Sequence, residues 1–411
     1  RQASLAKKFI KSICSYPKTK TIAFILPKSF KKDSFQKIFP LSFHLIHQED
    51  VEDTASDDSH LSIFVSRDQI FEDSMAIFEE TSSKTLRNAD LVINFEDEDA
   101  IDEGGPTKEW YGLLTKEIFR PHYELFSPTG DGVTYQPNPA SAKNEEHLRY
   151  FHFFGNFLAK AIYDRQLVDV QFCRVIYKHL LGLPPTIDDL GDIDSVYFTS
   201  LKWILNNDID DIIYETFSVT IDNFGEKKII DLIPNGSKIE VTNKNKEQYV
   251  SAIVKWTMCD AMKEQIEHLK KGFYEIVPLK EIKDFTPTEL SLLLNGKKDI
   301  NVDEMANQTK YTGGYSRSSV PVQFFWVAMK SFSKEERGEL LQYATGTNKA
   351  PLDGFDPAFT ITLAEGADVE NALPTAHTCF NQLVLPEYKS VETLMQKLRY
   401  AFKNSSGFQL T

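Results

Sequence analysis

Cysteine is scarce in this chain. Only four cysteines occur among the 411 residues, and they are Cys14, Cys173, Cys259 and Cys379, with no Cys-x-x-Cys pair among them. Structural zinc sites and disulfide frameworks need paired or clustered cysteines, so the spacing argues against both. Isolated thiols fit a reducing compartment, in which a free cysteine can persist for chemistry. We therefore expect a cytoplasmic or nuclear protein.

Several other patterns are also missing. No apolar run is long enough to span a bilayer, and the start lacks the charge, apolar run and cleavage site of a signal peptide. Neither Gly-x-Gly-x-x-Gly nor a Walker lysine motif is present, so no ATP site is expected. We expect neither a metal nor a cofactor. Because the chain begins with Arg1 rather than Met, we expect it to be a piece of a longer protein.

Positive charge is concentrated at the start of an acidic chain. The formal net charge is −14, yet residues 1–48 carry ten Lys or Arg and only one acidic residue, Asp33. A basic segment can bind nucleic acid or a membrane, but nothing here resembles a nucleic-acid-binding motif. We favour docking of this segment on the acidic body, or simple solvation. The acidic body argues against a nucleic-acid enzyme and is compatible with basic protein partners.

The apolar pattern predicts an α+β protein with two lobes. Residues 1–64 are predicted to be short basic helices followed by an acidic linker. The larger lobe, residues 65–295, contains a helix over 148–163 that is apolar nearly all round and should be buried. Within this lobe, residues 196–264 form a small α+β unit, with a helix over 197–205 and strands at 217–221 and 238–242.

A glycine break at residues 296–298 leads to a second lobe over 299–411. Helices are predicted at 322–329, 337–343 and 391–402, and strands near 359–362 and 382–385. A length of 411 residues is too great for one small core, which also favours several units.

One cysteine of this second lobe lies in a polar, turn-prone loop. Cys379 follows His377 and Thr378, and Pro374 interrupts regular structure ahead of them. Only the thiolate is nucleophilic, and at an ordinary pKa of ~8.5 about 3% of a thiol is ionised at neutral pH. A nearby imidazole or hydroxyl donors could raise that fraction. From local chemistry alone, an exposed reactive thiol and a buried inert one are equally supported.

The wider sequence resembles the HECT-type ubiquitin ligases. The loop Leu-Pro-x-x-His-Thr-Cys-Phe-Asn is similar to the active-site loop of that family, and six more strings match it in order and spacing. They are Phe71-Glu72-Asp73-Ser74, Asp102-Glu103-Gly104-Gly105, Lys108-Glu109-Trp110-Tyr111, Gly272-Phe273, Phe325-Trp326 and Ala344-Thr345-Gly346-Thr347. The likeness covers roughly residues 65–411 and is nearest to the very large, helical-repeat (Mule-like) members.

The resemblance implies roles for the loop and the tail. Cys379 corresponds to the nucleophile that carries ubiquitin as a thioester, with His377 and Thr378 as its catalytic loop neighbours. His377 is expected to help with proton transfer, provided that its geometry allows it. Phe408 matches a tail phenylalanine that the family links to transfer onto amines. The chain ends at Thr411 rather than at an acidic residue, which puts any role of a terminal acid in doubt.

The resemblance also implies a docking surface for a conjugating enzyme on the small α+β unit. Tyr197, Leu201, Tyr249 and Ile253 fall at the positions of an apolar groove, where exposed aromatic and aliphatic side chains make interface anchors. The alternative is that some of the four are core residues, and for Leu201 and Ile253 it is as well supported.

Gly296, Lys297 and Lys298 match the hinge between the family's two lobes. Glycine permits backbone angles that other residues resist, so rotation of the lobes is expected there.

The implied activity is ubiquitin transfer from a conjugating enzyme, through the cysteine, to lysines of protein substrates. Residues 1–64 could add self-association or autoinhibition.

Two rival interpretations of the function stay open at this point. A cysteine hydrolase usually takes a histidine from elsewhere in its fold, often after the cysteine, and no histidine follows Cys379. A scaffold that only binds ubiquitin and a conjugating enzyme would need no reactive thiol.

Overall fold

The computed structural model describes residues 60–96, 98, 105–223, 226–351, 354–364, 366 and 372–404. The helices and linker predicted for residues 1–59, the string at 102–104 and the tail residue Phe408 lie outside these described residues. A regulatory role of residues 1–64 therefore stays a prediction.

Helix α7 (His147–Tyr163) is the centre of the larger lobe, and as predicted it is buried over most of its surface. It packs against α12 (Lys263–Ile276) at very short range. A Cβ atom added to Gly155 would lie 2.1 Å from the backbone oxygen of Leu269, and one added to Gly272 would lie 1.9 Å from that of His152. Because real Cβ contacts are never so short, these two glycines set the distance between the helices.

The other elements of this lobe surround that helix pair. At its start, β1 (His60–Val65) and β2 (Asp90–Phe95) form a parallel pair, and β1 buries Ile63 and Val65. The packed lobe therefore begins before residue 65, the start that the sequence pattern indicated. The remaining elements are α4 (Ile70–Glu80), α5 (Ser83–Asn88), α6 (Gly105–Ile118), η1 (Pro121–Tyr123), β3 (Phe126–Pro128), β4 (Tyr135–Pro137), η2 (Ser141–Lys143), α8 (Arg174–Leu180), α13 (Leu279–Ile282) and α14 (Pro287–Asn295).

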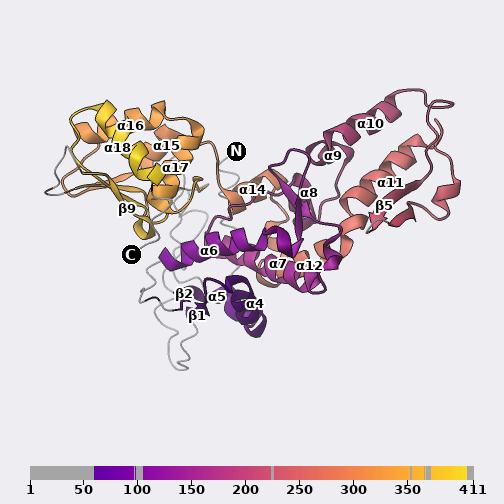
Figure 1. Ribbon diagram of the computed structural model, residues 1–411, viewed down its shortest axis with the longest axis horizontal. Coiled ribbons are helices and arrows are strands. Elements are labelled where there is room, and N and C mark those ends of the chain that lie inside the picture. Colours follow the sequence, from indigo (N-terminus) through magenta and orange to yellow (C-terminus); the bar gives the residue numbers. More distant parts are fainter. Residues whose placement is uncertain are drawn as a thin grey trace, which may run out of the picture.

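The small α+β unit projects from the far end of this lobe (Figure 1). It contains α9 (Ile187–Ile193), α10 (Ser195–Asn206), β5 (Ser218–Asn223), β6 (Glu226–Asp231), η3 (Gly236–Lys238), α11 (Lys246–Met258) and η4 (Asp260–Met262). The strand predicted at 238–242 is wrong. β5 pairs instead with β6, and Asn235, in the left-handed region at φ 58°, turns the chain into η3. In the predicted segment only a single bridge is formed, between Thr216 and Glu240.

The second lobe, the C-lobe, has a hydrophobic core of its own, formed between Ile300 and Phe402. Its elements are α15 (Val302–Gln308), β7 (Lys310–Thr312), α16 (Val320–Ser331), α17 (Lys334–Thr345), β8 (Thr360–Leu363), β9 (Thr375–His377), η5 (Thr378–Phe380), β10 (Gln382–Leu385) and α18 (Val391–Asn404). The sheet order is β7-β8-β10-β9, with only β9 antiparallel. Separate cores at the two ends of the chain confirm the predicted α+β, two-lobed fold. No helix in the described part of the chain is long and apolar enough to cross a bilayer.

Candidate active site

Cys379 lies at the tip of a tight hairpin. β9 and β10 pair antiparallel with His377 opposite Gln382, and η5 forms the turn between them. Asn381 closes this turn in the left-handed region at φ 49°, a conformation that asparagine tolerates better than most residues. The turn therefore presents Cys379 away from the sheet, half-buried, rather than in the apolar core.

Hydrogen bonds from the C-lobe hold this hairpin in place. The side-chain amide of the buried Asn381 donates to the Pro357 carbonyl at 2.6 Å, and the Thr360 amide donates to the Asn381 carbonyl at 2.9 Å. The Tyr343 hydroxyl donates to the Pro374 carbonyl at 2.6 Å, just before β9. The thiol is thus carried on a fixed support, which favours reproducible positioning of a reacting group.

The thiols of the described part of the chain differ in environment. Cys173 is buried, and this burial raises the pKa of its thiol to about 11. Burial also raises the pKa of the Cys259 thiol above its usual range. Neither environment favours a thiolate at neutral pH. Cys379, in contrast to the other two described cysteines, lines the open cleft between the lobes.

The predicted loop neighbours of Cys379 have different surroundings. The His377 side chain is exposed on β9, and no hydrogen bond joins its ring to Cys379 among the residues that the structure describes. Thr378 is half-buried, and its carbonyl accepts a hydrogen bond from the other lobe. A proton-transfer role for His377 therefore stays a prediction.

The opposite wall of the site is the first turn of α6. The Lys108 ammonium donates to the Thr378 carbonyl at 3.1 Å and to the Asn381 Oδ1 atom at 2.7 Å. Burial lowers the pKa of Lys108 to about 8, although the charges of Cys379 and Asp356 act in the opposite direction. A Cβ atom added to Gly105 would lie 2.3 Å from the Cys379 sulfur, so the thiol occupies the space that a side chain there would need.

Sequence reasoning missed both α6 residues as parts of the site. Lys108 and Gly105 entered it only as members of strings shared with the HECT family. The contacts of Lys108 are 270 and 273 residues away along the chain, and no local pattern signals a contact of that kind.

Further polar contacts join the lobes near the predicted hinge. The buried Lys349 ammonium lies 3.0 Å from a carboxylate oxygen of Asp169, and Arg165 lies 3.1 Å from Asp356. The backbones of Lys297 and Ala350 exchange hydrogen bonds at 2.7 and 3.0 Å.

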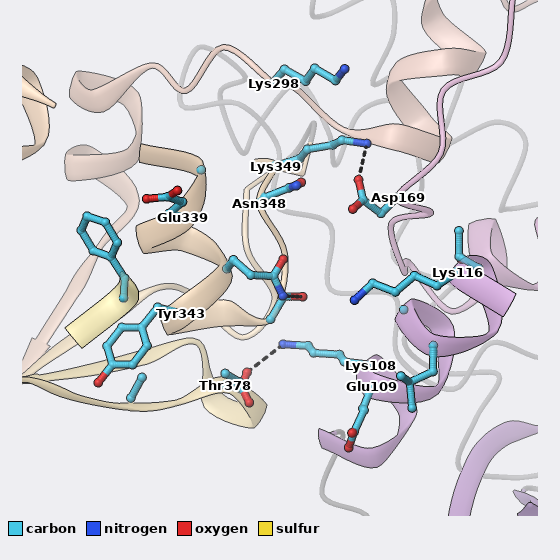
Figure 2. A pocket seen from close by; sticks show the side chains of 18 of the residues that line it. Lys108, Glu109, Lys116, Asp169, Lys298, Glu339, Tyr343, Asn348, Lys349 and Thr378 are labelled. Atoms are coloured by element: carbon cyan, nitrogen blue, oxygen red, sulfur yellow. Dashed lines mark hydrogen bonds and ion pairs between the residues drawn. The ribbon is translucent and has the colours of Figure 1, made fainter. Parts of the chain in front are cut away.

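The glycine of the predicted hinge is confined between the lobes. Gly296 has φ 67°, and a Cβ atom there would lie 2.8 Å from the Ala350 oxygen and 2.8 Å from a Leu167 methyl. Only glycine fits both the backbone angle and the space. Lys298 projects beside the cleft between the lobes (Figure 2).

This cleft has a volume of about 2180 Å³ and receives side chains from both lobes. Figure 2 shows Lys108 reaching across it to Thr378, and Lys349 facing Asp169. Cys379 and the half-exposed Phe380 lie on its border. The cleft is large enough for extended peptide segments.

The predicted docking anchors need correction. Leu201, Tyr249 and Ile253 are 1%, 5% and 0% exposed, because α10 and α11 turn these side chains into the core of the unit. They cannot contact a partner in this arrangement, and the core interpretation holds. Tyr197 is half-buried, and burial raises the pKa of its hydroxyl to about 12. The large apolar side chains that the unit exposes most are Val196, Trp203, Ile212, Tyr214 and Ile229.

Comparisons with known proteins agree with the fold and the loop. The model of the HECT-domain (ubiquitin-transferase) family matches residues 112–411, so the chain belongs to that family. It is 44% identical over 358 residues to the E3 ubiquitin-protein ligase ptr1 of Schizosaccharomyces pombe, covering 85% of this chain and 11% of ptr1.

Two further relatives are of the same kind. Identity is 43% over 361 residues to the E3 ubiquitin-protein ligase TOM1 of Saccharomyces cerevisiae, covering 85% of this chain and 11% of that protein. It is 39% over 359 residues to the mouse E3 ubiquitin-protein ligase HUWE1, covering 85% and 8% respectively. The chain therefore spans about a tenth of the length of these relatives.

Proposed function

We propose that this chain is the catalytic part of a ubiquitin-protein ligase, in which Cys379 accepts ubiquitin from a conjugating enzyme and passes it to lysines of protein substrates. The observation that carries the proposal is the half-exposed Cys379 at a hairpin tip, beside a cleft between two lobes of a HECT-family chain. A free thiol with this task needs a reducing compartment, which favours the cytoplasm or the nucleus.

The chemistry requires only acyl exchange. The Cys379 thiolate attacks the thioester carbonyl of ubiquitin on the conjugating enzyme, a new carbon–sulfur bond forms, and the enzyme's thiolate leaves. An amine then attacks the Cys379 thioester, the carbon–nitrogen bond forms, the sulfur departs with its electron pair, and the amine loses a proton to water. Because the first exchange replaces one thioester by another, positioning is the main task of the protein.

The conjugating enzyme would dock on the small α+β unit. Tyr214 and Trp203 are 83% and 44% exposed there, and exposed aromatic side chains are common interface anchors. Tyr214→Ala should weaken binding of a conjugating enzyme by about 1–2 kcal/mol. The exposed Tyr400, on α18 of the C-lobe, offers a matched control as Tyr400→Ala. Equal binding by all three proteins would place the docking surface elsewhere.

The decisive test is a charging assay. The chain is mixed with ubiquitin, activating enzyme, ATP and a panel of conjugating enzymes, and the products are separated with and without a thiol reductant. Wild type should form a reductant-sensitive ubiquitin adduct, Cys379→Ser a reductant-resistant ester or none, and Cys259→Ser the wild-type adduct. A sensitive adduct that persists in Cys379→Ser would overturn the assignment of the nucleophile. Binding of both partners with no adduct in wild type would support a scaffold instead.

A further inference from the structure

The arrangement of the lobes separates the thiol from the small α+β unit. In Figure 1 the C-lobe, with β9 and η5, lies at one end of the molecule, while α10, α11 and β5 lie at the other. A conjugating enzyme docked on that unit would have to bridge the length of the larger lobe to reach Cys379. The arrangement therefore corresponds to a step other than charging.

Two residues of α6 define what the thiol contacts instead. At Gly105 the absence of a side chain lets the Cys379 sulfur approach the helix backbone, and among the described residues only the sulfur and Cβ atoms of Cys379 lie within 4 Å of a Cβ placed there. One turn further, Lys108 holds the hairpin from outside through its bonds to Thr378 and Asn381. Asn381 also donates a hydrogen bond to the Pro357 carbonyl, so Lys108 is bonded to a loop residue that the C-lobe already holds in place.

We propose that the first turn of α6, through Gly105 and Lys108, is the larger lobe's half of the site at which ubiquitin leaves Cys379 for an acceptor amine. The inference rests on the proposed function and deepens it. Lys108 contacts the loop rather than the reacting atoms, so it acts as a positioning residue. Gly105 acts by leaving space for the sulfur.

The geometry favours transfer for a chemical reason. When the acceptor nitrogen attacks the thioester carbon, the carbon–sulfur bond breaks and Cys379 leaves as a thiolate. The Lys108 ammonium is bonded to the carbonyl of Thr378, the residue next to Cys379, and a cation stabilises negative charge that develops nearby. On the other side of the loop, the cleft has room for the ubiquitin tail and an acceptor lysine.

Gly105→Ala tests the contact with a single methyl group. Alanine is a good helix former, so α6 should persist while the sulfur is displaced. Gly112→Ala, on the same helix, is the matched control, because no atom of the residues that the structure describes lies within 4 Å of a Cβ there. Lys108→Ala removes the clamp, and Lys108→Arg keeps its charge and donors.

The two steps are measured separately in single-turnover reactions of the 411-residue chain with labelled ubiquitin. Charging is followed from a preloaded conjugating enzyme, and discharge is followed after adding free lysine. Gly105→Ala and Lys108→Ala should charge within about twofold of wild type and discharge about ten- to hundredfold more slowly. Lys108→Arg should regain most of the discharge rate, and Gly112→Ala should match wild type.

Discharge at the wild-type rate in both Gly105→Ala and Lys108→Ala would overturn the inference. So would faster overall turnover, which would make the contact a brake, and so would equal slowing of charging and discharge. In each of these cases wild type still forms the Cys379 adduct, so the proposed function survives. Loss of that adduct from wild type would instead count against the proposed function.

Discussion

The larger lobe has two junctions of opposite character. Its junction with the small α+β unit is apolar, because Leu201, Phe217 and Ile253 belong to the same buried cluster as the core around α7. Its junction with the C-lobe is built from the hydrogen bonds and ion pairs of Lys108, Lys349 and Arg165, and the C-lobe core is separate.

The difference indicates which junction moves. Continuous apolar burial contributes about 25 cal/mol per Å² and is lost if the surfaces separate. Ion pairs near the surface contribute only about 0–1 kcal/mol, because water replaces the partner at little cost. We therefore expect the small unit to stay fixed on the larger lobe, while the C-lobe rotates about Gly296.

Breaking the apolar junction should have the largest effect. Ile253 is fully buried on α11, so Ile253→Ala should lower the free energy of unfolding by about 2–5 kcal/mol. The control Ile229→Ala removes an exposed side chain of the same unit and should change that free energy by less than about 0.5 kcal/mol. Both are read by denaturant titration. An unchanged midpoint for Ile253→Ala, with weaker binding of conjugating enzyme, would restore its role as an anchor.

Fixing the hinge should slow catalysis and spare the lobes. Gly296 has φ 67° and its amide donates to the Leu292 carbonyl at 3.0 Å; proline requires a φ near −65° and has no amide hydrogen. Gly296→Pro should reduce ubiquitin transfer about a hundredfold, with circular dichroism unchanged. Gly132→Pro is the control, since Gly132 has φ 68° and donates to Thr129 at 2.9 Å, away from the hinge. A normal charging rate in Gly296→Pro would contradict the hinge assignment.

Weakening one ion pair between the lobes should have a smaller effect, which is a lower ratio of docked to undocked lobes. Asp169→Asn would leave the buried Lys349 without its anion, but Asp169 is half-exposed, so solvent screens the pair. We expect a cost of about 1 kcal/mol, or about fivefold in the ratio of docked to undocked lobes. Energy transfer between dyes on the two lobes measures that ratio. Asp299→Asn, which breaks a pair with Lys334 inside the C-lobe, should leave it unchanged.

The smallest effect should come from pH. With a pKa of about 8, Lys108 is mostly charged at pH 7 and mostly neutral at pH 9, whereas arginine at this position stays charged. The ratio of discharge rates, wild type over Lys108→Arg, should fall about two- to threefold between these values, because a charged donor makes the stronger hydrogen bonds. The charges of Cys379 and Asp356 favour the charged form of Lys108, and Cys379 is a thioester during discharge. A constant ratio would show that the charge of Lys108 is unimportant.

Local patterns predicted most elements but not their partners. The helix predicted at 148–163 and the strand predicted at 382–385 match α7 and β10. The helix carries a long apolar stretch, and the strand is a short apolar run that ends before Pro386. The strand β6, which pairs with β5, was missed because it is rich in charge and its alternation is weak.

The same reasoning explains the outcome at the site. Cys379 could be proposed because its loop resembles the active-site loop of the HECT family, whereas its local chemistry alone left an inert thiol equally supported. The burial of Leu201 and Ile253 could not be predicted. An apolar helix face has the same sequence pattern whether the same chain or a partner covers it. Lys108 was missed since its role exists only when the lobes meet.

The contact between the Cys379 sulfur and α6 also makes the thiol a reporter of its own position. While the hairpin is docked, the α6 backbone at Gly105 lies against the sulfur, so a bulky maleimide should react more slowly than when the lobes are apart. The buried Cys173 stays unreactive and serves as an internal reference. The alkylation rate at Cys379, read by mass spectrometry of its peptide, thus measures how often an unlabelled molecule opens.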